Sequence, residues 1–288
     1  MKIDRFRVRA GDADAIGRHR ADATPGIDDK DEAQAQLERG LERLRARQGL
    51  LYAQDRYALL LVFQGMDAAG KDGVIKHVMS GVNPQSTEVH AFKAPSSDEL
   101  DHDYLWRINR VLPPRGHIGI FNRSHYEEVI TVRVNPHFLD AQQLPPGHVK
   151  RSIWRDRFED IRNFEHHLFR NGTVIRKFFL HVSRAEQQRR LLERIDDPEK
   201  NWKFRSGDLD DRAKWKTFMS AYGEALAETS REHAPWYVIP ADRKWYARAL
   251  VAEIVVKTLE DLDLSYPKLT SARKAELAKA RRRLVNER

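Results

Sequence analysis

Short, continuous apolar runs alternate with amphipathic segments along most of this chain. In residues 31–54, leucines recur at helical spacing with charged residues between them, which predicts an amphipathic helix. Residues 56–64 (RYALLLVFQ) form an apolar run too short for a typical helix, and such a run is typical of a buried parallel strand. The glycine-rich segment 65–73 follows at once.

The same alternation continues toward the C-terminus. Further strands are predicted at 87–92, 116–122, 173–182 and 235–240, and further helices at 74–82, 97–111, 151–170, 183–197, 210–232 and 244–261, with Ser97 as the N-cap of the second of these helices. Strands that alternate with helices predict an α/β fold, a doubly wound parallel sheet with helices on both faces. Residues 1–30 lack periodicity and are expected to form a polar, extended arm.

Composition narrows the class of protein. The 288 residues include no cysteine, which excludes a disulfide framework, a thiol nucleophile and a thiolate metal site. No apolar run approaches the ~18 residues of a membrane span, and the first residues lack the apolar core of a secretory signal. The expectation is a soluble, cytoplasmic protein that does not associate with membranes.

The positive charge is concentrated at one end. The formal net charge is +8, but residues 273–288 hold seven basic and two acidic residues, and the rest of the chain has a net charge of only +3. Residues 263–288 are therefore interpreted as a basic tail with a helix-forming pattern. A site for a polyanion has to be argued from local residues, because the overall charge is weak evidence for one.

The segment 65–73 (GMDAAGKDG) carries the strongest chemical signal. It matches the pattern G-x-x-x-x-G-K and lies between a predicted strand and a predicted helix, which is the context of a phosphate-binding loop. Its glycines let backbone N–H groups face an anion, and Lys71 can reach terminal phosphate oxygens. The candidate phosphate-binding residues here are Gly65, Met66, Ala68, Ala69, Gly70, Lys71, Asp72 and Gly73.

Two acids distinguish this loop from an ordinary one. Asp72 stands where a Ser or Thr usually binds Mg²⁺, and Asp67 lies inside the loop. Phosphates repel a carboxylate unless a cation lies between them, and Mg²⁺ binds carboxylates together with substrate phosphates. Asp67 is therefore assigned either to binding Mg²⁺, or Mn²⁺ in its place, or to activating the attacking phosphate oxygen. The alternative is that Asp67 only caps the loop.

A second polar group, residues 121–128 (FNRSHYEE), follows the strand predicted at 116–122. Ligands bind at the carboxyl ends of parallel strands, so Asn122 occupies the Walker B position, as an amide instead of a carboxylate. Arg123 is placed to stabilise the charge on a transferring phosphoryl group. Ser124 can cap the next helix, and His125 and Tyr126 either pack or take part in catalysis.

A third group, in the charged region that follows, mixes basic and aromatic residues. It comprises Arg190, Arg194 and residues 200–205 (KNWKFR), which suit a flap over phosphates and a base. From charge alone, a solvated helix face is the favoured interpretation.

Taken jointly, the motifs resemble family-2 polyphosphate kinases. The matching stretches are residues 61–85, 91–107, 116–134, 194–212 and 234–248. The resemblance implies a P-loop kinase-like, three-layer α/β/α domain over residues 31–262, with a helical lid at about 183–232. It also implies dependence on Mg²⁺ and transfer of phosphoryl groups between inorganic polyphosphate and nucleotides. Asp67 and Lys71 then belong to the Walker A loop, and Asp67, Asn122 and Glu127 are the candidate metal ligands.

Residues 122–127 (NRSHYE) resemble the class III members, which phosphorylate both AMP and ADP, where many other members have Asp-Arg-Ser-Trp-Tyr-Asn. Glu127 can bind a second Mg²⁺ or order water beside the shorter nucleotide. Its alternative role is a favourable interaction with a helix dipole. The expected activity is phosphoryl transfer from polyphosphate to AMP and ADP, with ATP as a product.

Six basic residues are candidates for the polyphosphate channel: Lys76, Lys93, Arg123, Arg133, Lys203 and Arg205. We also expect a homo-oligomer, a dimer or a tetramer, and no specific nucleic-acid partner. Two other functions remain open at this point. One is a nucleotide kinase that uses ATP as the donor, which the acidic loop argues against. The other is a polyanion-binding module without turnover, which the intact Asp67 and Lys71 argue against.

Overall fold

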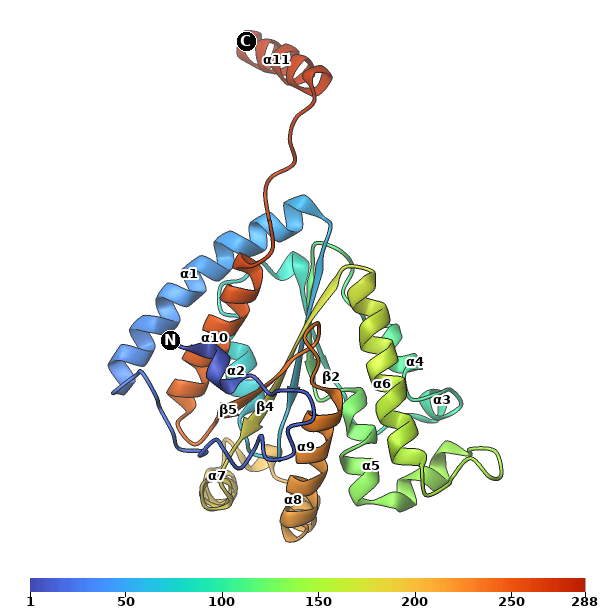
Figure 1. The fold of residues 1–288 in the computed structure, drawn as a ribbon. Coiled ribbons are helices and arrows are strands. Elements are labelled where there is room, and N and C mark those ends of the chain that lie inside the picture. The colour runs from blue at the N-terminus through green and yellow to red at the C-terminus, as the bar shows by residue number, and fades with distance from the viewer. Residues whose placement is uncertain (288) are drawn as a thin grey trace.

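Five parallel strands form one sheet at the centre of the molecule (Figure 1). The computed structural model describes residues 1–287. The strands are β1 (Ala58–Gln64), β2 (Thr87–Ala91), β3 (Ile118–Asn122), β4 (Thr173–His181) and β5 (Trp236–Pro240), in the order β2-β3-β1-β4-β5. All seven residues of β1 are buried, as expected for a central parallel strand covered on both faces. The predicted parallel α/β sheet is confirmed.

Helices cover both faces of this sheet and complete three layers. On one face α1 (Lys30–Gln54) packs against α10 (Lys244–Glu260), which also contacts α2 (Lys71–Val78). On the other face α6 (Ile153–Arg170) packs against β4 and against α9 (Trp215–Thr229). The remaining helices are α3 (Ser97–Leu100), α4 (Trp106–Asn109), α5 (Thr131–Val134), α7 (Arg184–Asp196), α8 (Gly207–Ala213) and α11 (Ser271–Asn286), and the short 3₁₀ helices are η1 (Ile3–Phe6), η2 (Pro84–Ser86), η3 (His125–Glu128), η4 (Pro136–Gln142) and η5 (Asn201–Lys203).

The first thirty residues correct the expectation of a polar, extended arm. They are mostly irregular, but the side chains of Phe6 and Val8 are buried in the main core. The N–H group of Val8 donates to the carbonyl of Trp236 at 2.9 Å, and the hydroxyl of Tyr246 donates to the carbonyl of Pro25 at 3.1 Å. The arm therefore packs onto the β5 edge and α10. Its apolar residues lack a period because they contact several elements in turn.

Two predicted helices are each broken in two. Residues 97–111 form α3 and α4, because the Asp103 carboxylate accepts the N–H of Leu105 at 2.9 Å and turns the chain between them. The N-cap of α3 is Ser96, one residue before the predicted Ser97, with a reciprocal pair of hydrogen bonds to Glu99. Residues 210–232 are interrupted at Lys214, between α8 and α9.

The interruption at Lys214 divides the predicted lid, residues 183–232, into two parts. The side chains of Phe218, Tyr222 and Leu226 on α9 belong to the main hydrophobic core, so α9 is part of the layer that covers the sheet. Of the predicted lid, α7 and α8 lie beyond the carboxyl ends of the strands (Figure 1). The part of the predicted lid (183–232) that lies outside this core is residues 183–214, which are called the lid segment below.

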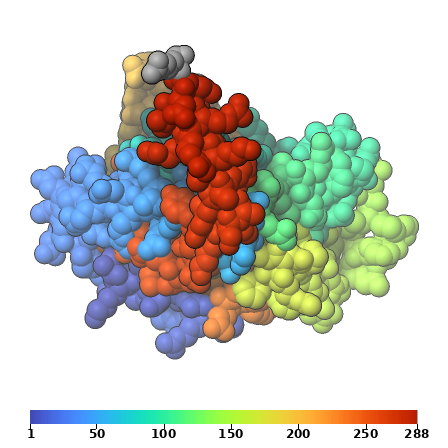
Figure 2. Space-filling model, turned by 90° about the horizontal axis from the view of Figure 1, so that it is seen from above, coloured from blue at the N-terminus to red at the C-terminus, as the bar shows by residue number. Residues whose placement is uncertain are grey.

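The basic tail forms an isolated helix. Helix α11 has no buried residue and follows residues 263–270, which are neither helix nor strand. It lies at the end of the molecule opposite α7 and α8, and Figure 2 views the molecule from that end. Arg288, the last residue of the predicted tail, lies outside the described residues. Within residues 1–287, no helix has both the length and the apolar character needed to cross a membrane.

Candidate active site

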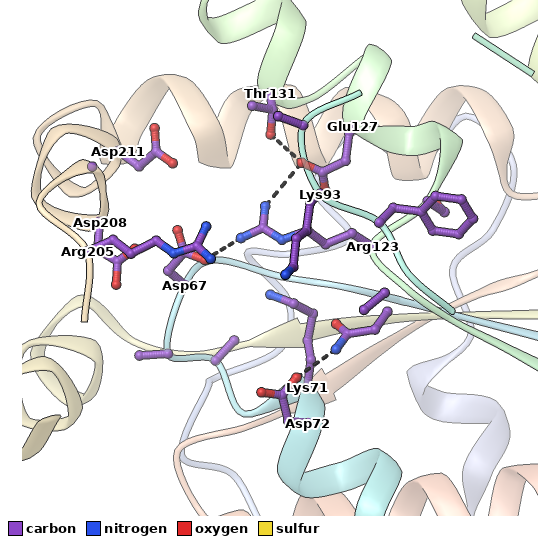
Figure 3. A pocket seen from close by; sticks show the side chains of 18 of the residues that line it. Asp67, Lys71, Asp72, Lys93, Arg123, Glu127, Thr131, Arg205, Asp208 and Asp211 are labelled. Atoms are coloured by element: carbon purple, nitrogen blue, oxygen red, sulfur yellow. Dashed lines mark hydrogen bonds and ion pairs between the residues drawn. The ribbon is translucent and has the colours of Figure 1, made fainter. Parts of the chain in front are cut away.

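A cavity of about 1530 Å³ opens at the carboxyl ends of β1 and β3. Three parts of its wall carry the charged groups discussed below: the loop and first turn of α2 at 67–74, the segment 122–128 after β3, and residues 190–214 of the lid segment. Residues from 91–107, 131–142 and 241–248 complete the wall. Figure 3 shows the charged side chains from these parts pointing toward one another. Parallel α/β proteins bind their ligands at this edge of the sheet, so this cavity is the candidate active site.

The backbone of the loop adopts conformations that ordinary residues avoid. Gly65 has φ +153°, and a Cβ atom there would lie 2.9 Å from the carbonyl oxygen of Leu180. Gly70 has φ +104°. Ala68 and Arg123 are not glycines, yet they have φ angles of +60° and +63°. A left-handed non-glycine residue costs about 1–2 kcal/mol, so the surrounding contacts must hold both of them in place.

The ammonium group of Lys71 lies beneath the loop. Nζ donates to the carbonyl oxygens of Gly65 at 2.7 Å and Met66 at 3.3 Å. Burial lowers the pKa of Lys71 to about 8, and the charge of Arg123 acts in the same direction. An ammonium group has three donors, so one remains for a phosphate oxygen. Gly65 and Met66 do not line the cavity, which corrects their expected direct role, and they act here as acceptors for Lys71.

Arg123 joins the loop to the segment after β3. Its guanidinium forms an ion pair with Asp67 and another, at 3.1 Å, with Glu127 (Figure 3). The charge of Glu127, together with that of Asp67, raises the pKa of Arg123 against the opposing effect of burial. Glu127 also accepts the hydroxyl of Thr131 at 2.6 Å. The predicted residues Asp67, Arg123 and Glu127 therefore form one linked group.

Asn122 and Asp72, the two residues that depart from the usual motifs, contact each other. The amide Nδ2 of Asn122 donates to Oδ1 of Asp72 at 2.6 Å. A carboxylate at position 122 would repel Asp72 at this distance, whereas an amide donates a hydrogen bond to it. The two departures from the ordinary motif thus compensate each other.

The lid segment contributes four acids that the sequence analysis missed: Glu193, Asp208, Asp210 and Asp211. Asp208 and Asp211 on α8 line the cavity. Burial, followed by the charge of Asp67, raises the pKa of Asp211 to about 6 and also raises that of Asp208. Their spacing of three residues places them on one face of a helix, which was the available signal. Nothing local indicated that this face meets Asp67.

The predicted polyphosphate channel is only partly assembled. Lys93, Arg123, Lys203 and Arg205 line the cavity, and the exposed indole of Trp202 lies beside Lys203. The prediction that Lys76 belongs to this channel is wrong, because Lys76 is exposed on α2 and does not line the cavity. The same prediction is wrong for Arg133, which does not line the cavity. Its guanidinium pairs with Glu224 at 2.5 Å and lies over the ring of Phe158.

Three further side chains of the 121–128 segment, Ser124, His125 and Tyr126, are buried. The hydroxyl of Ser124 accepts the N–H of Tyr126 at 3.2 Å, which confirms Ser124 as a helix cap, here of η3. Tyr126 is fully buried, and its hydroxyl donates to Glu165 at 2.7 Å. Its neighbour His125 is also buried, and burial lowers its pKa.

The acids around the cavity fit a cation that is shared with a substrate. Across the described chain, no three His, Asp or Glu side chains lie close enough to hold a metal ion by themselves. Asp67 faces the acids of α8 across the cavity, and the charge of Asp67 raises their pKa values. Mg²⁺ typically takes one or two carboxylates and completes its shell with water and phosphate oxygens. This donor set fits that arrangement.

Comparison with known proteins decides the family. The family model described as polyphosphate kinase 2 (PPK2) matches residues 27–267. The chain belongs to the polyphosphate kinase 2 family. The crystal structure of polyphosphate kinase 2 from Arthrobacter aurescens TC1 is 38% identical, with a TM-score of 0.85 over 95% of both chains. The predicted family and the P-loop kinase-like α/β fold are thus confirmed.

Two relatives of this family are similar over most of their length. The ADP-polyphosphate phosphotransferase of Rhodopseudomonas palustris is 50% identical over 286 residues, 99% of each chain. The AMP/ADP-polyphosphate phosphotransferase of Meiothermus ruber is 49% identical over 241 residues, 84% of this chain and 85% of the relative. Membership in this phosphotransferase family implies a divalent cation, and the acids described above are available to bind one.

Proposed function

We propose that this enzyme transfers the terminal phosphoryl group of polyphosphate to both AMP and ADP in the presence of Mg²⁺, with Mn²⁺ as a possible substitute. The observation that carries the proposal is the position of Arg123. It links Asp67 of the phosphate-binding loop to Glu127 after β3, inside a cavity that basic lid residues also line. The guanidinium of Arg123, held between these two acids, is a fixed positive charge that suits the charge-spread transition state of phosphoryl transfer.

Each group then has a role that follows from its position. The loop N–H groups and Lys71 bind the phosphates of the acceptor nucleotide, and Arg123 stabilises the transferring group. Lys93, Lys203 and Arg205 bind the donor chain. A phosphate oxygen of the nucleotide attacks the terminal phosphorus of polyphosphate in line, and the phosphoanhydride bond to the shortened chain breaks. Asp67 would hold the divalent cation with phosphate oxygens, and Asn122 and Glu127 would support it. When bound, the cation neutralises phosphate charge.

The direct test is a product assay without added ATP. Polyphosphate is supplied with AMP, ADP, GMP or GDP in separate reactions, and the nucleotide products are separated and quantified. We expect AMP to yield ADP and then ATP. A reaction that requires added ATP would instead identify an ATP-dependent nucleotide kinase. Binding of polyphosphate without any product would indicate a non-catalytic module.

The choice between AMP and ADP is expected to depend on Glu127. AMP is one phosphate shorter, so an enzyme that uses both must accept an α- or a β-phosphate as the nucleophile at one loop. Glu127→Asn should lower kcat/KM for AMP by about 10-fold more than for ADP, because it removes the charge that would bind a cation or order water there. The assay measures both nucleotides at saturating polyphosphate and Mg²⁺.

Thr131→Val is the matched control for this substitution. It removes one hydrogen bond to Glu127 but leaves the carboxylate in place. It should therefore affect both nucleotides equally and weakly. Equal losses for AMP and ADP in Glu127→Asn would assign the residue to holding Arg123 or the following helix, and would contradict a role in substrate choice.

Deletion of residues 273–288 should leave the chemistry intact. Helix α11 is exposed along its whole length and lies opposite the lid, so it has no buried contact with the cavity. We expect kcat to be unchanged. The KM for polyphosphate should change less than about 3-fold, since distant charges are screened, and this KM should depend less on salt concentration than in the full chain. Loss of all activity in a folded truncation would place the tail in the site or in an essential subunit contact.

Three expectations from the sequence stay predictions. They are a cytoplasmic location, assembly into a dimer or tetramer, and the lack of a specific nucleic-acid partner.

A further inference from the structure

The backbone carbonyls of the phosphate-binding loop need donors of their own. A loop that presents its N–H groups to phosphates turns its carbonyl groups away from them, and buried carbonyls are almost always hydrogen-bonded. Lys71 supplies the donors for residues 65 and 66. The next three carbonyls, of Asp67, Ala68 and Ala69, accept hydrogen bonds from two side chains of α7, more than a hundred residues later in the sequence.

Arg190 holds two of these carbonyls together. One guanidinium nitrogen donates to Ala68 at 3.0 Å and to Ala69 at 2.9 Å. The other nitrogens donate to the carbonyl of Ala241 at 2.6 Å and to the carboxylate of Glu186 at 2.7 Å. Arg190 is only 4% exposed, so its charge does not face solvent. Its fork fixes the left-handed peptide at Ala68 against the end of β5.

Gln187 connects the loop to the lid. Its side chain is fully buried, and Nε2 donates to the carbonyl of Asp67 at 3.0 Å. Its Oε1 accepts a hydrogen bond at 2.9 Å from Arg212 of α8. The amide therefore lies between the peptide that carries Asp67 and the helix that carries Asp208 and Asp211. A shift of α8 that moves Arg212 away removes the hydrogen bond that Oε1 of Gln187 accepts.

We propose that Gln187 and Arg190 are positioning residues of the phosphate-binding loop, and that Gln187 couples the position of lid helix α8 to the Asp67 peptide through Arg212. The inference rests on the proposed function, in which this loop binds the nucleotide phosphates. Gln187 does not line the cavity, and Arg190, which does, directs its donors to backbone carbonyls and to Glu186. Each acts through the loop backbone, whose N–H groups bind the phosphates.

The first experiment separates loop geometry from general stability. Arg190→Lys keeps the charge but loses the planar fork that joins the loop carbonyls to Ala241 and Glu186. We expect it to weaken binding of ADP and to lower kcat by about 10-fold or more, and to leave binding of adenosine, which lacks phosphates, unchanged. The matched control is Arg189→Lys, because Arg189 is exposed on the same helix and does not contact the loop. Equal weakening of ADP and adenosine, or wild-type binding of both, would overturn the role of Arg190.

The second experiment is a double-mutant cycle between Gln187→Leu and Arg212→Met. If the two residues act through one contact, each single substitution lowers kcat by about 5- to 10-fold and the double variant is no worse than the more impaired single one. Losses that multiply would refute the coupling. Wild-type activity in both single variants would refute it as well.

The wild-type enzyme in the same assays tests the proposed function separately. Failure of the wild type to make ATP from ADP and polyphosphate would reject the proposed function. The ratio of ADP to adenosine binding among the variants still tests the loop inference in that case.

Discussion

Lys71→Ala and Asp67→Asn should each lower kcat/KM by at least ~100-fold, as the loss of a main electrostatic group at a phosphoryl-transfer site often does. The lysine lies beneath the loop with one donor left for phosphate, and its removal also leaves the carbonyls of Gly65 and Met66 without that partner. Asp67→Asn keeps the size of the side chain but removes the charge that pairs with Arg123 and would hold the cation.

The measurement is initial-rate kinetics with ADP and polyphosphate over a range of Mg²⁺ concentrations. Lys76→Ala is the matched control, because Lys76 lies on α2 as Lys71 does but is exposed and outside the cavity. We expect this control to keep wild-type kinetics. Near wild-type turnover in folded Lys71→Ala or Asp67→Asn would reject the assignment of the loop as the catalytic phosphate site.

Lys177→Met should destabilise the fold by about 3–5 kcal/mol, since it removes one partner of a buried ion pair and leaves the other charge uncompensated. The ammonium of Lys177 is fully buried on β4, and Nζ lies 2.5 Å from Glu165 and 2.8 Å from the hydroxyl of Tyr126. Burial lowers the pKa of Lys177 to about 8. Burial acts to raise the pKa of Glu165, but the neighbouring Lys177 and His125 together outweigh it and lower that pKa.

Denaturant unfolding, followed by circular dichroism, measures this loss. The double variant Lys177→Met with Glu165→Leu should recover a large part of the stability, because it no longer buries an unpaired charge. Lys257→Met, which breaks an exposed pair with Asp261, is the control and should change stability little. A double variant that is less stable than Lys177→Met alone would contradict the explanation by an unpaired Glu165.

The sequence determined the features that depend on neighbouring residues. The apolar run of β1 and the following glycine-rich loop define a strand–loop–helix unit, because strand burial, glycine conformations and the start of α2 all arise within one short segment. The cap at Ser124 and the placement of Arg123 after β3 follow in the same way. The joint set of motifs was specific enough to indicate the family.

Features that join distant segments were decided only by the tertiary structure. The sequence did not reveal that Arg133 pairs with Glu224, that the first thirty residues pack onto β5 and α10, or that α9 belongs to the core. Periodicity reports which face of an element is apolar and does not identify its partner. The pairing of Asn122 with Asp72 joins residues fifty positions apart, and Arg190 reaches loop carbonyls more than a hundred positions away. These contacts exist because the parallel sheet brings the carboxyl ends of its strands to one edge, where the loop, the segment after β3 and α7 meet.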